Sequence, residues 1–272
     1  MVSTVNHVIN YVPELDLFLD STSSTTPFGM LPFQVADKPV LLMDGFKDGL
    51  RTPATAVGSN EQHTKTAIKV QSDGSIKATM DIAQKGMFAA NSRAWMRNFP
   101  KEQEAELVKN AFESSGMIAT GSLKKDDPTA LLDRYKFGLK MEVKSYFQRP
   151  GAGAFMIEPL FWTEAPVQRY VWSAVAPDET HDVACSNGTS IEEYTYTFPE
   201  DMQVLSVPDN FEMKNQFLSY QATYTLAGRK LTVFRKFEDR TAGNVCSPAL
   251  MAEYKALTAQ VIPNMRAQVL YK

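Results

Sequence analysis

His7 and Asp20 are residues near the start of the chain whose types and spacing suggest chemistry. They lie in two stretches of alternating apolar residues joined at Pro13-Glu14, a pattern that predicts a β-hairpin. If the hairpin is symmetric about that dipeptide, His7 faces Asp20, and Ile9 faces Phe18. Directly opposed side chains have Cβ atoms about 4.5–5.5 Å apart, so an imidazole and a carboxylate would be neighbours. Such a pair is the orienting half of a Cys-His-Asp or Ser-His-Asp site.

Both residues also have ordinary structural interpretations. A histidine on a strand near a chain terminus is more often a half-buried residue than a catalytic one. An aspartate that precedes Ser21 and Thr22 often serves as a turn or cap residue. Spacing alone therefore favours the structural roles over the catalytic one.

Residues 6–22, NHVINYVPELDLFLDST, are followed by PFGMLP at residues 27–32. Together they resemble the end of the transglutaminase-like, papain-type core of large secreted bacterial proteins. The resemblance implies the catalytic order Cys, His, Asp, with His7 and Asp20 at the family's His and Asp. Only six residues precede His7 and none is cysteine, so the nucleophile is missing. We expect a C-terminal part of such a protein, truncated before the catalytic Cys and inactive alone.

The composition is typical of a soluble globular protein, and 272 residues can bury a sizeable core. We predict three parts: a remnant of the transglutaminase-like core with a linker at residues 1–62, and two β-rich α+β domains at 63–163 and 164–272. The net charge of -3 provides no basic field for nucleic acid. No apolar run approaches the roughly 20 residues that span a bilayer, so we expect neither nucleic acid nor a membrane span.

The first β-rich part is predicted to follow a short buried strand at residues 39–44 and a turn at 45–49. Residues 64–70 and 75–83 then alternate and predict a hairpin. A helix is predicted over 88–96, and another after Pro100, with Leu107, Val108, Ala111 and Phe112 as its apolar stripe and Gly116 as its cap. Residues 135–143 show the clearest strand alternation in the chain.

The second β-rich part shows alternating patterns at residues 167–175, 190–198, 203–207, 217–227 and 230–238. Ser247-Pro248 predicts the start of a helix, with a capping residue and a proline in the first turn. A last strand is predicted at 267–271. The fold class is therefore α+β and β-rich, with antiparallel sheets each covered by one or two helices, preceded by the remnant hairpin. The order of elements resembles the β-rich domain that follows the core in this family.

Cys185 and Cys246 leave two interpretations open: two buried thiols or one disulfide. Export would favour the disulfide, because oxidising compartments preserve such bonds. The residues at the start of the chain have neither a basic segment nor an apolar one, so they do not form a signal peptide. The resemblance nevertheless implies an extracytoplasmic location, in the periplasm or at the cell surface.

The histidines His7, His63 and His181 do not have metal-ligand spacing, and we expect neither a metal nor a cofactor. Three functions remain. The first is a non-catalytic segment that recognises a substrate or partner polypeptide, or the missing N-terminal core. The second is a thiol-dependent enzyme of transglutaminase or protease type whose Cys comes from an upstream or separate segment. The third is a cell-surface binding or assembly module.

Overall fold

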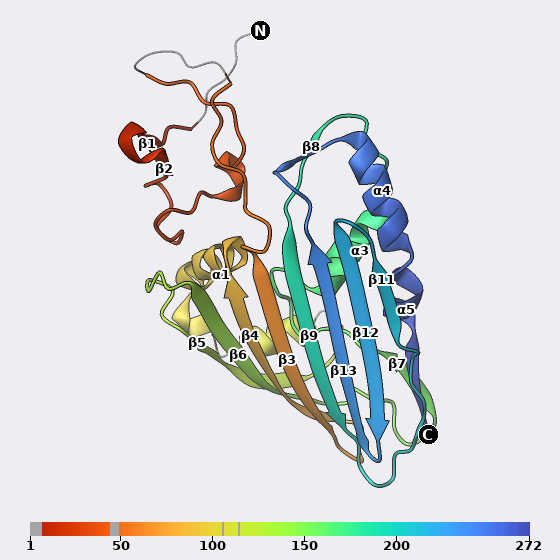
Figure 1. Cartoon of the computed structure of the whole chain (residues 1–272). Helices are drawn as coiled ribbons and strands as arrows, with labels where there is room; N and C mark the ends of the chain where they lie inside the picture. Colours follow the sequence, from red (N-terminus) through yellow and green to blue (C-terminus); the bar gives the residue numbers. More distant parts are fainter. Residues whose placement is uncertain (1–6, 44–48, 105, 114) are drawn as a thin grey trace.

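An eight-stranded sheet forms the body of the molecule (Figure 1). The computed structural model describes residues 7–43, 49–104, 106–113 and 115–272. Across the sheet the strand order is β11-β12-β13-β9-β3-β4-β6-β5. In chain order these strands are β3 (Glu61–Val70), β4 (Ile76–Lys85), β5 (Ala119–Lys125), β6 (Arg134–Val143), β9 (Gly188–Thr197), β11 (Phe211–Lys214), β12 (Leu218–Ala227) and β13 (Lys230–Asp239).

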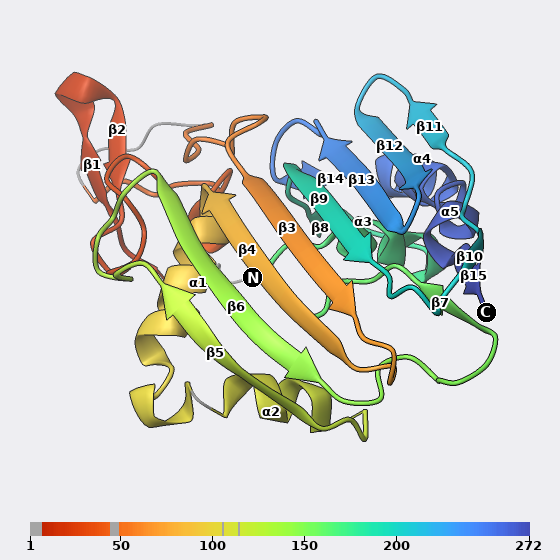
Figure 2. The same ribbon diagram turned by 90° about the horizontal axis from the view of Figure 1, so that it is seen from below.

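One face of this sheet carries the hydrophobic core. Alternate residues of each long strand are buried, as the period of two requires, and they include Ile76, Met80, Leu139 and Val233. The helices are α1 (Met87–Asn98), α2 (Leu107–Glu113), α3 (Val167–Val171), α4 (Pro248–Ala259) and α5 (Ile262–Arg266). Figure 2 shows α1 and α2 beside the β4–β6–β5 side of the sheet and α3 to α5 beside the β9–β13–β12 side. The opposite face is open to solvent.

Strands β3 and β9 pair in parallel, whereas every other neighbouring pair in this sheet is antiparallel. The α+β, β-rich class is thus confirmed, although the main sheet is mixed rather than purely antiparallel. Residues on both sides of the boundary predicted near 163 belong to this one sheet, since β3 precedes it and β9 follows it. The two predicted β-rich parts therefore share a hydrogen-bonded sheet.

Three smaller sheets complete the fold. β1 (Asn10–Val12) pairs with β2 (Leu17–Leu19), and β8 (Val183–Ala184) pairs with β14 (Val245–Cys246). β15 (Gln268–Tyr271) lies between β10 (Val204–Ser206) and β7 (Gly153–Met156). Short 3-10 helices are η1 (Pro13–Leu15), η2 (Phe33–Val35), η3 (Lys101–Gln103) and η4 (Trp172–Val175).

Two strand predictions were wrong. Residues 167–175 are helical in α3 and η4, because Val167, Tyr170 and Val171 form a buried i, i+3, i+4 stripe rather than a period of two. Of residues 39–44, those that the structure describes make a single bridge between Pro39 and Arg51, and Met43 is fully exposed. Asp44 and most of the predicted turn at 45–49 lie outside the described residues.

Both helices predicted on either side of Pro100 are present, but their bounds differ from the predicted ones. The first is α1, and its N-terminal residue follows Gly86, whose φ of +67° suits glycine. A Cβ there would approach the carbonyl oxygen of Ser59 to 2.3 Å, so only glycine fits. After Pro100 the chain forms η3 before α2, in which Leu107, Val108 and Phe112 are buried. The predicted Ala111 is exposed.

Three buried asparagines connect the linker before β3 to the sheet. The Asn60 amide nitrogen donates to the Asn187 carbonyl at 3.1 Å, and Asn187 donates to the Thr55 carbonyl at 3.1 Å. The Thr55 amide in turn donates to Asn244 Oδ1 at 2.7 Å. These amides bond the backbone of segments far apart in the sequence, and so they fix the path of residues 55–60.

Candidate functional site

The structure brings His7 and Asp20 together. His7 Nε2 lies 2.8 Å from Asp20 Oδ2, within hydrogen-bonding distance. The Asp20 side chain is 1% exposed, whereas the His7 side chain is 35% exposed. A covered carboxylate therefore holds an imidazole that solvent reaches on its other side.

The register that led to this pair was wrong by two residues. Tyr11 faces Phe18 and Val12 faces Leu17, because η1 and a left-handed Asp16 (φ 45°) make the loop longer than a two-residue turn. A shift by an even number of residues keeps each side chain on its own face. His7 and Asp20 therefore become diagonal neighbours, at a spacing that a long side chain can still cross.

Thr22 holds the other oxygen of the Asp20 carboxylate. Its backbone amide and its hydroxyl donate to Asp20 Oδ1 at 2.9 and 2.7 Å. Burial raises the pKa of the Asp20 carboxyl, but these two bonds and the His7 contact outweigh burial and keep the pKa below its ordinary value. Asp20 therefore makes the turn contact that its position before Ser21 and Thr22 suggested, in addition to its contact with His7.

The geometry determines what the imidazole can do. When Nε2 donates its proton to Asp20, Nδ1 carries the lone pair and can accept a proton from a nucleophile. A thiol cannot come from this chain, since its two cysteines form a disulfide. Cys185 and Cys246 lie at β8 and β14 with their Cα atoms 5.8 Å apart. The described residues thus place an imidazole beside a carboxylate and bring no thiol to them.

The other two histidines lie elsewhere. His63 Nε2 is 2.6 Å from Glu193 Oε1 on the open face of the sheet, and His181 Nδ1 is 2.8 Å from the Thr180 hydroxyl. Within the described residues, no group of three His, Cys, Asp or Glu side chains could hold a metal ion. None of the described helices has the length and apolar character needed to cross a membrane.

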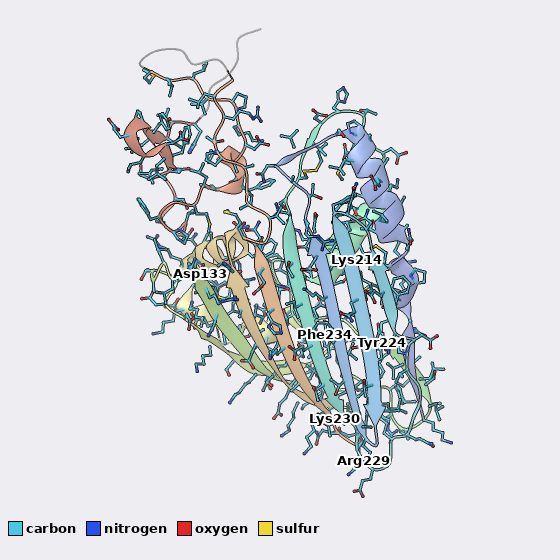
Figure 3. All side chains as sticks on the ribbon, viewed as in Figure 1. Asp133, Lys214, Tyr224, Arg229, Lys230 and Phe234 are labelled. Atoms are coloured by element: carbon cyan, nitrogen blue, oxygen red, sulfur yellow. A yellow bond between two sulfur atoms is a disulfide. The ribbon has the colours of Figure 1, made fainter. Side chains whose placement is uncertain are left out.

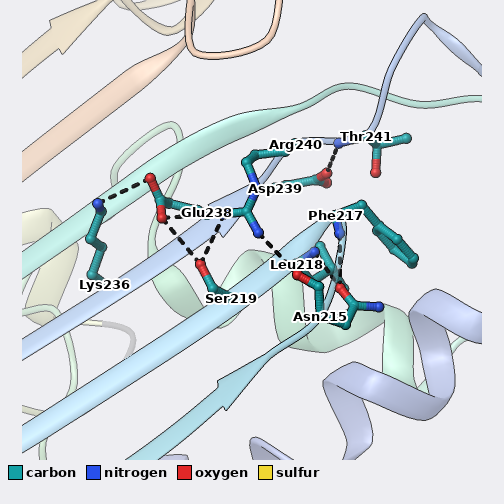
Figure 4. A network of polar contacts seen from close by, with 9 residues as sticks. All are labelled: Asn215, Phe217, Leu218, Ser219, Lys236, Glu238, Asp239, Arg240 and Thr241. Carbon is teal, nitrogen blue, oxygen red and sulfur yellow. Dashed lines mark hydrogen bonds and ion pairs between the residues drawn. The ribbon is translucent and has the colours of Figure 1, made fainter.

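A second cluster of polar side chains lies at the ends of β12 and β13 (Figure 4). Arg240 Nη1 donates to Ser219 at 3.1 Å and to Glu238 at 3.3 Å, and Lys236 contacts Glu238 at 3.0 Å. Burial raises the pKa of the Glu238 carboxyl, but the bonds from Lys236 and Ser219 lower it further than burial raises it. Its donors and acceptors satisfy one another, so this network secures the strand ends.

Comparison with known proteins gives two findings. Residues 176–271 match the model of a domain of unknown function with a solved structure, DUF3858. Among solved structures, the chain is similar to the crystal structure of a "putative protease" from Parabacteroides distasonis, at 17% identity and a TM-score of 0.36. That similarity covers 44% of this chain and only 23% of the length of the solved one. No curated protein matches the chain.

Proposed function

We propose that this chain is a segment of a transglutaminase-like protein and is not catalytically active alone. It supplies the oriented imidazole of a thiol-dependent acyl-transfer site and recognises polypeptide, while the thiol comes from another segment. The observation that carries this proposal is the 2.8 Å contact between His7 Nε2 and the covered Asp20 carboxylate. The resemblance of residues 6–32 to the end of a transglutaminase-like core supports the same assignment.

The chemistry of such a site follows from the free ring nitrogen. His7 Nδ1 takes the proton of the incoming thiol, and the thiolate attacks the carbonyl carbon of a peptide amide. The amine leaves with the proton from the imidazolium, and a thioester remains. Water or a second amine then attacks the thioester and restores the thiol. Throughout, Asp20 keeps the ring oriented and stabilises the imidazolium.

The surface of the N-terminal segment supports a role in polypeptide recognition. Val8, Leu15 and Phe28 are 78%, 70% and 83% exposed, and Met43 is 100% exposed. Large apolar side chains so exposed in one segment of about forty residues favour contact with another polypeptide. The segment that brings the thiol is the partner we propose for them. A cell-surface assembly module, the alternative, would use the same apolar side chains.

We also propose an extracytoplasmic location for the protein. The Cys185–Cys246 disulfide supports it, because structural disulfides persist mainly in oxidising compartments. Isolating the protein from its own cells under alkylating conditions tests this point. Recovery of the two cysteines in the bridged form is expected, and free thiols in the native protein would contradict it.

The tautomer of His7 tests the proposed site directly. Nitrogen-15 NMR at pH 8 is expected to show the Nε2–H form, since Asp20 accepts that proton. In Asp20→Ala both tautomers should become populated. A dominant Nδ1–H form in the wild-type chain would leave no base for a thiol and would overturn the proposal.

An activity assay tests the non-catalytic part. The purified chain, incubated with peptide amides and a primary amine, is expected to release no ammonia above a no-protein blank. A His7→Ala variant serves as the control for contaminating activity. Release that is present in the wild type and lost in His7→Ala would show that the chain is an enzyme alone.

A further inference from the structure

The open face of the main sheet contains a groove of about 620 Å³. It lies across β5, β6, β4, β3 and β9, on the side opposite the helices and towards the end of the sheet where the β3–β4 hairpin turns. The strand pairing fixes which side chains form it. Ser122 faces Lys140, Lys140 faces Thr79, Thr79 faces Ala67, and Ala67 faces Thr195. This row, which crosses five strands, forms the floor.

Apart from Lys140, the residues of the floor are small, and most of them can form hydrogen bonds. Ser122, Thr79, Ala67 and Thr195 leave room above the backbone, and three of them carry hydroxyls that both donate and accept. Adjacent strands are about 4.8 Å apart, so five strands span about 19 Å. A polypeptide in extended conformation covers that length with about six residues, at about 3.3 Å per residue.

The groove is basic although the whole chain is slightly acidic, with a net charge of -3. Its lining includes Lys69, Lys77 and Lys140 but only one acidic residue, Glu142. Lys77 and Glu142 contact one another at 3.0 Å. Within the described part of the chain, Lys69 and Lys140 have no ion-pair partner. Two ammonium groups thus remain available for anionic groups of a ligand.

We propose that this groove binds an extended acidic segment of a polypeptide, with carboxylates on Lys69 and Lys140. The strand register places the backbones of these lysines about 12 Å apart, which corresponds to carboxylates four residues apart, on one face of an extended chain. The floor hydroxyls bond the backbone of the bound segment. This assignment does not depend on the His7–Asp20 site.

The lining favours a peptide over other anions. It contains no aromatic side chain, so neither sugar rings nor bases have a surface on which to stack. Hydroxyls that both donate and accept suit the alternating amides and carbonyls of a peptide backbone. Polypeptide is therefore the ligand class that this groove fits best.

Fluorescence anisotropy with the full chain tests the proposal. The probe is a labelled Gly-Glu-Gly-Gly-Gly-Glu-Gly peptide, and its glutamine counterpart is the neutral control. Binding is expected for the glutamate peptide only, and Kd should rise several-fold between about 50 and 300 mM salt, because screened charges contribute less. Lys69→Glu/Lys140→Glu should raise Kd at least tenfold.

Two further variants separate the groove from general charge and from misfolding. Lys136→Glu/Lys214→Glu makes the same charge change on the same face but outside the groove; Figure 3 shows Lys214 at the opposite end of the sheet from Lys230. It should retain nearly wild-type affinity. Ala67→Phe changes no charge and fills the exposed floor, so it should abolish binding while circular dichroism and Tm stay unchanged.

Several outcomes would overturn the proposal. Equal weakening by both charge variants would show a field effect rather than a site. Unchanged binding by Ala67→Phe would place the ligand elsewhere. Equal affinity for the glutamine peptide would remove the role of the lysines. Displacement of the peptide by polygalacturonate at a lower concentration of carboxylate would make the ligand an acidic glycan.

Discussion

Asp20 uses its two carboxylate oxygens for different partners. Thr22 occupies Oδ1 through its amide and hydroxyl, and His7 contacts Oδ2. With both oxygens held, the carboxylate cannot rotate, and the imidazole plane is set by a group that is itself fixed. This arrangement explains how a short hairpin can orient a ring whose other side is exposed.

Replacing Thr22 with valine should raise the pKa of Asp20, since the change removes the hydroxyl donor and keeps the side-chain shape. The carboxyl pKa is depressed in the folded chain, so its stabilising contribution is present above the ordinary value of 3.8 and is lost as pH falls through the folded value. In Thr22→Val the folded pKa lies closer to 3.8, so this contribution should be smaller and its loss should be complete at a higher pH. Carbon-detected NMR titration of Asp20 measures it.

Thr129→Val is the matched control for that experiment. Thr129 makes the same pair of bonds to Asp127 Oδ1, at 2.8 and 2.7 Å, and holds the pKa of Asp127 below its ordinary value. The control should raise the pKa of Asp127 and leave Asp20 unchanged. A Thr22→Val variant with an unaltered Asp20 titration would contradict the role given to the hydroxyl.

The sequence predicted correctly that His7 and Asp20 lie close together. The strand register from which this was predicted was wrong. Local alternation places two side chains on one face of a hairpin, but the loop length decides the register, and the left-handed Asp16 is not evident from pattern alone. The groove lysines were not predicted. Lys69 and Lys140 become neighbours only through the pairing of three strands.

Strand β13 carries a fully buried arginine between the sheet and the segments that cover it. Arg235 is 0% exposed, and its guanidinium donates to the Ile157 carbonyl at 2.7 Å and to the Tyr224 hydroxyl at 3.1 Å. Burial raises the pKa of the nearby Glu192 carboxyl, and the positive charge of Arg235 opposes that rise. The side chain thus links β13 to residue 157 and to β12.

Arg235→Leu should lower the free energy of unfolding by about 3–5 kcal/mol, because it leaves the buried Ile157 carbonyl and Tyr224 hydroxyl without their charged donor and removes the positive charge near Glu192. Urea denaturation at neutral pH measures the change. The control is Arg229→Leu at the exposed tip of the β12–β13 hairpin (Figure 3), whose ion pair with Glu200 is solvent-exposed. That variant should lose less than about 1 kcal/mol. Equal losses of unfolding free energy in the two variants would contradict a stabilising role for the buried contacts of Arg235.

At the scale of elements, strict alternation proved the most dependable signal. It predicted β4, β6, β12 and β13 because each has one buried and one wet face, and Ser247 correctly marked the start of α4. It failed at residues 167–175, where apolar residues are dense enough to fit either period. There Glu192 accepts a hydrogen bond from the Val167 amide at the helix start, a partner far away in sequence.

Over the whole molecule, the Cys185–Cys246 disulfide closes a loop with a sequence separation of 61 residues. Cys185→Ser/Cys246→Ser should lower the free energy of unfolding by about 4 kcal/mol in the chain-entropy model, since the unfolded chain regains that loop. Urea denaturation measures it. Reducing agent should destabilise the wild type by a similar amount and leave the double variant unaffected. No difference between variant and wild type would contradict the model.

The arrangement of the whole molecule was the part least accessible from sequence. Predicted boundaries at residues 62 and 163 follow loops rich in small and polar residues, but the sheet continues across the second one. The parallel pairing of β3 with β9 is what joins the two predicted parts into one sheet. A local sequence pattern can identify a strand, but it does not indicate the strand with which it pairs. The disulfide partners, in contrast, needed no choice, since the chain has only two cysteines.

Because β3 pairs with β9, which lies far later in the sequence, β3 is synthesised well before its partner strand. His63 and Glu193, which contact one another across β3 and β9, are 130 residues apart in sequence. At about 5–20 residues per second, translation separates the two strands by on the order of ten seconds. During that interval the hydrogen-bonding edge of β3 awaits its neighbour, and nascent chains on adjacent ribosomes can compete for it.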